Sequence, residues 1–202
     1  MKKTIVAISG SPSKGRNSDT MLDAFITGIK EVEGVDVQKI YTADINCEYY
    51  RFENKDGAQK NEEELQKLFD SIETAHGLVI ASPTYNFSVP AGLKNIIDRM
   101  RPIALDMQNI NIFKQPKGKL SYLKTYFIVS GGTPHYLQKI LFVLFPPFWL
   151  SAVFKYYGAR LGGSTYGGNF KEQNLAMNNE GLMRRIQKKG KKYAKRLRNG
   201  KI

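Results

Sequence analysis

Cysteine and histidine are scarce in this chain of 202 residues, which contains one cysteine and two histidines. Because Cys47 has no second cysteine to pair with, no internal disulfide can form, and we expect a cytoplasmic protein. No Ser-His-Asp set and no group of metal-ligating residues is apparent in the sequence. We therefore expect neither hydrolysis by a triad nor a bound metal ion.

Long uninterrupted hydrophobic runs are also lacking. The most apolar stretch, 140–154, is shorter than the roughly 20 residues that a membrane-spanning helix requires, and Pro146 and Pro147 interrupt it. The first residues, Met1, Lys2 and Lys3, lead directly into a short strand-like run. We therefore expect no signal peptide.

Acidic residues are outnumbered: the chain has 18 of them and 31 lysines and arginines, so its formal net charge is +13. Such a balance favours anionic partners, among them phosphates, nucleic acid and membrane surfaces. The basic residues crowd the last 20 positions, where a solvated helix face and a contact with an anionic membrane are both open interpretations. Nucleic acid is disfavoured as a partner because no interleaved aromatic pattern or nucleic-acid motif accompanies the charge.

Five segments have the pattern of β-strands. Thr4–Ser9 shows no polar alternation, as expected for a strand that is covered on both faces. Leu78–Ala81 is an apolar run short enough for a buried strand, and Lys124–Ser130 also has the pattern of a strand. Val35–Tyr41 and Ala159–Tyr166 supply two further strands. Helical segments separate the strands, so we predict an α/β fold with a doubly wound parallel sheet in the order 2-1-3-4-5.

The helices are predicted from apolar residues at helical spacing. One begins near Ser18, one at Asn61 with three glutamates in its first turn, and one follows Pro90. The last begins around Lys171 and forms a basic C-terminal helix at about 171–200. With 42% hydrophobic residues, residues 1–202 are expected to form a single domain.

The loop after the first strand, Gly10–Asn17, has the character of a phosphate site. A hydroxyl-rich basic loop precedes a helix N-terminus, where free amides can bind an anion. Arg16 and Asn17 stand where a P-loop requires Lys and Ser/Thr, so a nucleotide triphosphatase is disfavoured. The dinucleotide pattern G-x-G-x-x-G is also absent. A loop that binds one terminal phosphate remains.

The segment from Ser82 to Met100 is the second candidate. A buried strand leads into a loop that Pro83 and Pro90 stiffen, and a helix follows. Ligands of open α/β sheets bind beyond the carboxyl ends of strands. A proline-held loop with Thr84, Tyr85, Asn86 and Phe87 at its tip offers groups that suit a flat heterocycle with polar rims, although packing alone could also account for the aromatics.

Both loops resemble those of the NADPH-dependent FMN reductase family, which includes azoreductases, quinone reductases and iron–sulfur flavoproteins. The likeness lies in Gly-Ser-Pro-x-Lys-Gly-x-Asn-Ser from Gly10 and in Ser-Pro-x-Tyr-Asn-Phe-Ser-x-Pro-Ala-x-Leu-Lys-Asn from Ser82. It implies a flavodoxin-like three-layer sandwich, FMN as cofactor, and NADPH or NADH as electron donor. By this likeness the FMN would be held by Ser9, Ser11, Ser13, Lys14, Arg16, Asn17, Ser18, Pro83, Thr84, Tyr85, Asn86, Phe87, Ser130, Gly131 and Gly132.

In the family, the position of Ser130-Gly131-Gly132 faces the flavin, and the two glycines would let the backbone approach a ligand closely. His135 follows this loop, either as an acid or base or as a loop residue without a chemical role. No catalytic side chain is needed, because the flavin N5 itself would accept the hydride.

Two related classes of protein can be weighed against the sequence. Iron–sulfur flavoproteins of this superfamily carry several cluster cysteines, and Cys47 alone cannot hold such a cluster. A flavodoxin-like electron carrier is the alternative function, but its flavin surroundings are typically acidic. The positive charge at Lys14 and Arg16 favours instead an NAD(P)H-dependent oxidoreductase that acts on a flavin, a quinone or a related small-molecule acceptor.

The apolar segment from Leu137 to Tyr157 is expected to form two helical pieces with a break, and its part from Leu141 to Phe154 is expected to need a second covering surface. We predict a homodimer in which this segment lies at the interface and helps to wall the substrate pocket. The alternative is a peripheral contact with an anionic membrane, aided by the basic C-terminal helix.

Overall fold

The computed structural model describes residues 2–51, 53, 58–59, 61–112, 114–141, 146–170, 172 and 175–202. Its central element is a five-stranded parallel sheet in the order β2-β1-β3-β6-β7. The strands are β1 (Lys3–Ser9), β2 (Val35–Tyr41), β3 (Gly77–Pro83), β6 (Lys124–Ser130) and β7 (Arg160–Gly167). In terms of these core strands the order is 2-1-3-4-5, as predicted.

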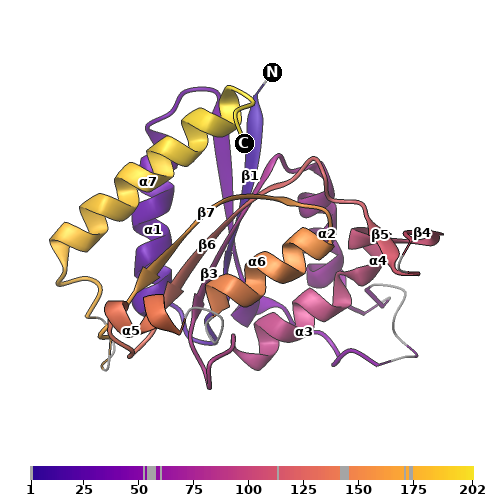
Figure 1. Ribbon diagram of the computed structural model, residues 1–202, viewed down its shortest axis with the longest axis horizontal. Helices are drawn as coiled ribbons and strands as arrows, with labels where there is room; N and C mark the ends of the chain where they lie inside the picture. Colours follow the sequence, from indigo (N-terminus) through magenta and orange to yellow (C-terminus); the bar gives the residue numbers. More distant parts are fainter. Residues whose placement is uncertain are drawn as a thin grey trace.

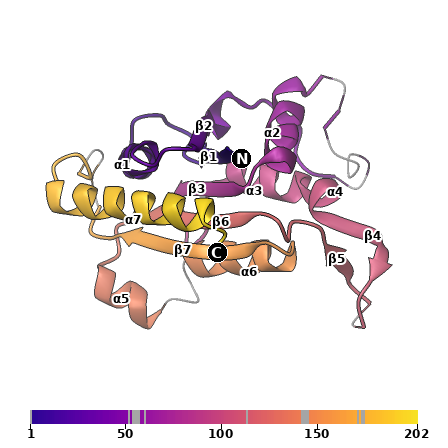
Figure 2. The ribbon, with the colours of Figure 1, turned by 90° about the horizontal axis from the view of Figure 1, so that it is seen from above.

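Helices cover both faces of the sheet, which gives the three layers seen in Figures 1 and 2. One face carries α1 (Asn17–Lys30) and α7 (Glu180–Arg198), and the other carries α2 (Glu63–Thr74), α3 (Ala91–Arg99) and α6 (Pro146–Tyr156). A short helix, α5 (His135–Ile140), follows β6. None of the helices that the structure describes combines the length and the apolar character needed to cross a membrane.

The alternation of side chains in the inner strands explains why both faces are covered. In β1, Ile5 and Ala7 belong to the core beneath α1 and α7, whereas Val6 and Ile8 belong to the core on the opposite face. All four side chains are at most 3% exposed. A strand that is apolar on both faces can be stable only between two layers, and the sequence pattern therefore selects this architecture.

A small hairpin was absent from the sequence-based prediction. After α3 the chain forms α4 (Arg101–Ala104) and then the antiparallel pair of β4 (Leu105–Ile110) and β5 (Pro116–Gly118). A single 3-10 turn, η1 (Thr42–Asp44), follows β2. Figure 1 shows the hairpin projecting from the body of the molecule, at the opposite end from α5 and α7.

Two helices begin later than the sequence indicated. The second helix starts at Glu63 rather than Asn61, and Glu62 turns into the protein, where it is only 2% exposed. The C-terminal helix starts at Glu180, after a turn at 175–178, so the predicted start around Lys171 was wrong. Lys171 itself lies outside the described residues. The side chain of Asn179 caps α7 by accepting a hydrogen bond from Leu182 N at 3.0 Å.

The apolar segment does form two helical pieces, α5 and α6, as predicted. Residues 142–145 between them, including Phe145, lie outside the described residues. Pro146, Pro147, Leu150 and Phe154 are buried in α6. The protein's own sheet therefore covers much of this apolar segment. Ile140, Leu141 and Phe148 nevertheless remain 71%, 42% and 45% exposed.

Glycine lets α1 and α7 pack backbone to backbone. A Cβ on Gly28 would lie 1.9 Å from the carbonyl oxygen of Gln187, and a Cβ on Gly190 would lie 2.1 Å from that of Phe25. No side chain can occupy that space, so the two glycines permit the close contact that fixes α7 along the outer face of the sheet.

Candidate functional site

A cavity of about 220 Å³ opens at the carboxyl ends of β1, β3 and β6. This is the edge at which parallel α/β sheets bind ligands. Eleven of the fifteen residues predicted from the sequence meet there, although they come from three distant parts of the chain. They are Ser11, Ser13, Arg16, Asn17, Ser18, Pro83, Thr84, Tyr85, Ser130, Gly131 and Gly132.

The loop between β1 and α1 is held in shape by Asp19, in the first turn of α1. Its carboxylate accepts a hydrogen bond from the backbone N–H of Gly15 at 2.7 Å, and Gly15 has a positive φ of 71°. Lys39 lies 2.6 Å from the other oxygen of Asp19, so the carboxylate is neutralised. Burial opposes the charge of Lys39, but its hydrogen bonds to Asp19 and Asp23 prevail and raise its pKa.

Three predicted phosphate ligands already have partners. The Asn17 side chain donates to the carbonyl oxygen of Glu172 at 2.8 Å and accepts from Ala176 N at 2.9 Å. The Ser11 hydroxyl donates to the carbonyl oxygen of Ser13 at 2.7 Å. Lys14 reaches Asp44 at 2.7 Å instead of lining the cavity. Asn17 and Ser11 therefore shape the loop, and Arg16 is the cationic residue of the loop that lines the cavity.

Three buried hydroxyls of the site have no hydrogen-bond partner within the described part of the chain. They belong to Ser9 at the end of β1, Ser18 in the first turn of α1, and Thr84 just after β3. Buried polar groups are normally satisfied, and each unsatisfied one is costly. Two of them, those of Ser18 and Thr84, line the cavity and indicate a place for a polar ligand there. Ser9 does not itself line the cavity.

The loop after β3 ends in a tight turn. Tyr85 and Ser88 exchange two backbone hydrogen bonds of 2.9 and 2.8 Å, and the two residues between them, Asn86 and Phe87, have φ values of 48° and 61°. Positive φ is uncommon for a bulky residue such as phenylalanine and stores strain there. The turn exposes Asn86 and Phe87, the latter by 62%, beyond the residues that line the cavity.

The loop after β6 comes close to Tyr166 of β7. A Cβ on Gly131 would lie 2.5 Å from the Tyr166 hydroxyl and 3.1 Å from Thr84 Oγ1, so a larger residue at this position would displace the Tyr166 side chain. The Tyr166 hydroxyl donates to the carbonyl oxygen of Thr133 at 3.2 Å. Its ring stacks against His135, with ring centroids 6.3 Å apart. His135 thus lies behind Tyr166 and does not line this cavity.

Sequence reasoning missed four residues of this site. Phe170 and Glu172 line the cavity, Asp19 shapes the phosphate loop, and Tyr166 closes the side toward β7. An aspartate in the first turn of a helix was a signal for Asp19. No local pattern pointed to Phe170 or Glu172, which reach the site only because the chain returns there after β7.

The arrangement fits a phosphorylated, planar cofactor. The N-terminus of α1, the unsatisfied Ser18 hydroxyl and the Arg16 side chain form an anion site at one end. Pro83, Thr84 and Ser130–Gly132, from the loops after β3 and β6, also line the cavity. FMN has one terminal phosphate and a flat ring system, the two features that these two groups of residues would bind.

Comparisons with known proteins point to flavin-dependent relatives. A family model described as NADPH-dependent FMN reductase matches residues 3–154. An FMN-dependent NADH:quinone oxidoreductase of Mycoplasma genitalium is 31% identical over 147 residues, which are 66% of this chain and 70% of the relative. An iron–sulfur flavoprotein of Archaeoglobus fulgidus is 33% identical over 105 residues, 48% of this chain and 45% of that protein.

Solved structures share the fold at low sequence identity. An azoreductase of Bacillus anthracis superposes with a TM-score of 0.72 at 14% identity, covering 95% of this chain and 98% of the other. An NAD(P)H:quinone oxidoreductase of Methanothermobacter marburgensis gives 0.69 at 15% identity, covering 95% and 98%. These similarities show the flavodoxin-like arrangement of the chain.

Proposed function

The chain belongs to the NADPH-dependent FMN reductase family, and from this premise we propose that it is an FMN-dependent NAD(P)H oxidoreductase. The proposed reaction takes a hydride from NADPH or NADH and passes it to a flavin, a quinone or a similar small acceptor. A related protein of Mycoplasma genitalium is described as an FMN-dependent NADH:quinone oxidoreductase. The observation that carries the proposal is the cavity at the carboxyl ends of β1, β3 and β6, which is lined by the unsatisfied hydroxyls of Ser18 and Thr84.

We assign the two ends of FMN to two parts of the cavity. The phosphate would bind the N-terminus of α1 with Ser13, Arg16 and Ser18, while Ser11 and Asn17 hold the loop in place. Pro83–Tyr85 and Ser130–Gly132 would border the isoalloxazine. Bound there, the flavin supplies the hydride-accepting N5, and the protein's part is to orient the reactants and keep the ring beside polar backbone groups.

Purified protein is expected to bind FMN with a shifted visible spectrum, and NADPH or NADH should bleach the bound flavin in stopped-flow mixing. The same measurement distinguishes this oxidoreductase from the alternative, a flavodoxin-like electron carrier. Bleaching by a reduced protein donor, with no useful rate from either nucleotide, would favour the carrier. A protein that shows no binding even at high FMN concentration would contradict the proposal.

We also propose a homodimer through the exposed side of α5 and the neighbouring turn of α6, with Ile140, Leu141 and Phe148 at the interface. Their exposed apolar surface supports the proposal. Replacing Ile140 and Phe148 with serine is expected to lower the mass in light scattering from dimer to monomer. If the variant remains a dimer but no longer sediments with anionic vesicles, the result would instead support the peripheral membrane contact. A wild type that is monomeric and does not sediment with vesicles would contradict both proposals.

A cytoplasmic location is proposed from the single cysteine, which suits a reducing compartment. Cell fractionation tests it directly, since recovery of the protein outside the cytoplasmic fraction would contradict it.

A further inference from the structure

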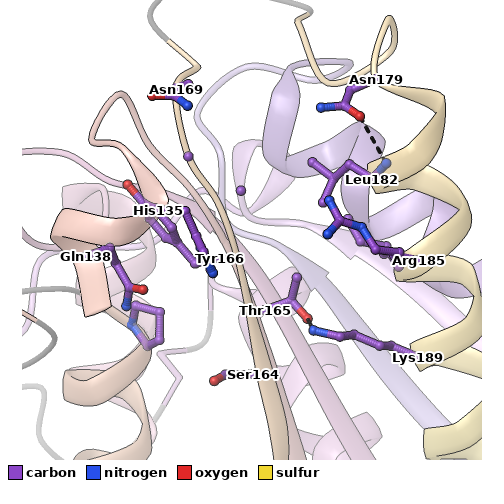
Figure 3. A pocket seen from close by; sticks show the side chains of 14 residues that line it. His135, Gln138, Ser164, Thr165, Tyr166, Asn169, Asn179, Leu182, Arg185 and Lys189 are labelled. Atoms are coloured by element: carbon purple, nitrogen blue, oxygen red, sulfur yellow. Dashed lines mark hydrogen bonds between the residues drawn. The ribbon is translucent and has the colours of Figure 1, made fainter. Parts of the chain in front are cut away.

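A second and larger cavity of about 520 Å³ lies on the outer side of β7. Figure 3 shows it between α5, which carries His135 and Gln138, and α7, which carries Leu182, Arg185 and Lys189, with β7 along its floor. β7 is the edge strand of the sheet, so this side of the strand has no neighbouring strand among the described residues. The family model ends at residue 154 and therefore assigns no role to either β7 or α7.

One aromatic side chain separates this cavity from the proposed FMN site. Tyr166 lines the larger cavity, while its hydroxyl is the atom that a Cβ on Gly131 would meet at 2.5 Å. Gly131 and Thr84, on the other side of this hydroxyl, both line the FMN cavity. A long ligand could therefore extend past Tyr166 with one end in each cavity.

The larger cavity is positively charged. Arg185 and Lys189 lie one helical turn apart on α7, and no carboxylate is among the residues that line the cavity. Lys189 donates one hydrogen bond to Thr165 Oγ1 at 2.9 Å, which leaves two of its N–H groups available. Arg185 has no hydrogen bond or ion pair to any residue that the structure describes, whereas its neighbour Arg184 pairs with Glu180. Burial and the charge of Arg185 both lower the pKa of Lys189.

The positive charge continues along the same helix. A third cavity of about 200 Å³ shares Ser164 and Lys189 with the larger one and is also lined by Lys192 and Arg196. The two cavities together form a basic groove, bounded by β7 and α7 and leading away from Tyr166. Such a groove suits an elongated ligand that carries several negative charges.

We propose that this basic groove binds the phosphate groups of the pyridine dinucleotide donor, with the pyrophosphate at Arg185 and Lys189. The inference rests on the proposed function, because the nicotinamide end must reach the FMN cavity to deliver its hydride. The position of Tyr166 then makes it the residue over which the dinucleotide passes. Arginine and lysine are the side chains that most often bind phosphate oxygens.

The test is calorimetric titration of FMN-loaded protein with ADP-ribose, the portion common to NADH and NADPH that lacks nicotinamide. The double variant Arg185→Gln/Lys189→Gln is expected to bind ADP-ribose at least tenfold more weakly than wild type, because charge-assisted hydrogen bonds to phosphate are lost. Its affinity for FMN should change by less than about threefold, since neither side chain lines the FMN cavity.

Arg184→Gln/Lys188→Gln is the matched control. It removes the same two charges from the same helix, one position earlier and thus about 100° around the axis, and neither residue lines the groove. The control should bind ADP-ribose within about twofold of wild type. Equal losses in the two double variants, or no binding of ADP-ribose to the wild type, would overturn the inference.

The outcome is separable from that of the proposed function. Suppose that the wild type binds FMN and that NADPH or NADH bleaches the bound flavin. If its affinity for ADP-ribose is nevertheless the same in the Arg185→Gln/Lys189→Gln variant, the groove proposal alone is refuted. Protein that takes up no FMN refutes the function instead. If the double variant unfolds, the single variant Arg185→Gln replaces it, because the Arg185 side chain has no structural partner among the described residues. Its affinity for ADP-ribose is expected to fall at least threefold.

Discussion

Replacing Arg99 with methionine is expected to destabilise the protein by about 3–5 kcal/mol, as is usual when one member of a buried ion pair is removed. The guanidinium is 0% and the Glu62 carboxylate 1% exposed. Arg99 Nη2 donates to Glu62 Oε2 at 2.5 Å, and Nη1 donates to Glu62 Oε1 at 3.0 Å and to the carbonyl oxygen of Glu48 at 2.8 Å. Methionine is similarly long but leaves the carboxylate without its counter-charge.

The pair ties three parts of the chain together. Glu62 also accepts backbone hydrogen bonds from Glu48 and Gln59, both at 2.7 Å. Asn95, one turn before Arg99 on α3, accepts from Tyr50 N at 2.7 Å. The irregular segment after η1 is thus held against α3, the helix that directly follows the Tyr85–Ser88 turn. Loosening this contact is expected to disturb the wall of the cavity as well as the fold.

The loss of stability should depend on pH. Burial favours the neutral acid, but Arg99 and the two backbone donors outweigh it and lower the pKa of Glu62 in the folded protein. The wild type therefore keeps this stabilisation above the unfolded pKa of about 4.3 and loses it as the pH falls through the lower folded value. Without Arg99, burial should raise the folded pKa, so the variant gains stability on acidification. The difference in unfolding free energy should accordingly be largest near neutral pH and shrink toward about pH 4.

Urea unfolding of the wild type and the variant at several pH values measures this. Lys94→Met is the matched control, because Lys94 pairs with Asp98 on the same helix at 2.6 Å while its side chain is 43% exposed. Its cost should be within about 0.5 kcal/mol. An Arg99→Met variant no less stable than this control, or a difference that stays constant with pH, would contradict the assigned role.

Ser18→Ala is expected to weaken FMN binding by about 10- to 150-fold, the loss of one hydrogen bond to a charged group of about 1.5–3 kcal/mol. The Ser18 hydroxyl is buried, has no partner within the described residues and sits in the first turn of α1 beside the cavity. In FMN-free protein the same change removes an unsatisfied buried group. The variant without FMN should therefore be as stable as the wild type or more so.

The opposite signs of these two effects make the prediction specific. Thr27→Ala, on an exposed part of the same helix, is the control, since its hydroxyl bonds to the carbonyl oxygen of Asp23 at 2.9 Å. It should leave FMN affinity unchanged. Fluorescence titration with FMN and thermal melting of the FMN-free proteins provide the measurements. Unchanged affinity in Ser18→Ala would show that the hydroxyl does not contact the cofactor.

Most of the sheet could be predicted from the sequence because its inner strands carry a strong local signal. A run such as Leu78–Ala81 is apolar on both faces, and only a covered parallel strand accommodates it. The order of the strands and the meeting of three loops at one edge then follow from the rules of doubly wound folds. The same rules brought eleven predicted residues to one cavity, where their binding of FMN stays a prediction.

Only the tertiary structure determined the contacts between residues far apart in the chain. Periodicity indicates that a side chain is buried, but not which partner it contacts. The sequence suggests that Glu62 is a favourable charge at the start of a helix, yet in the structure it pairs with Arg99, 37 positions later. Asn17 reads as a phosphate ligand, yet its amide holds Glu172, 155 positions away. The position of α7 beside β7, and hence the groove at Arg185 and Lys189, likewise depends on two glycines whose missing side chains let two helices touch. Such contacts are chosen by the packing of the whole chain, which no local pattern encodes.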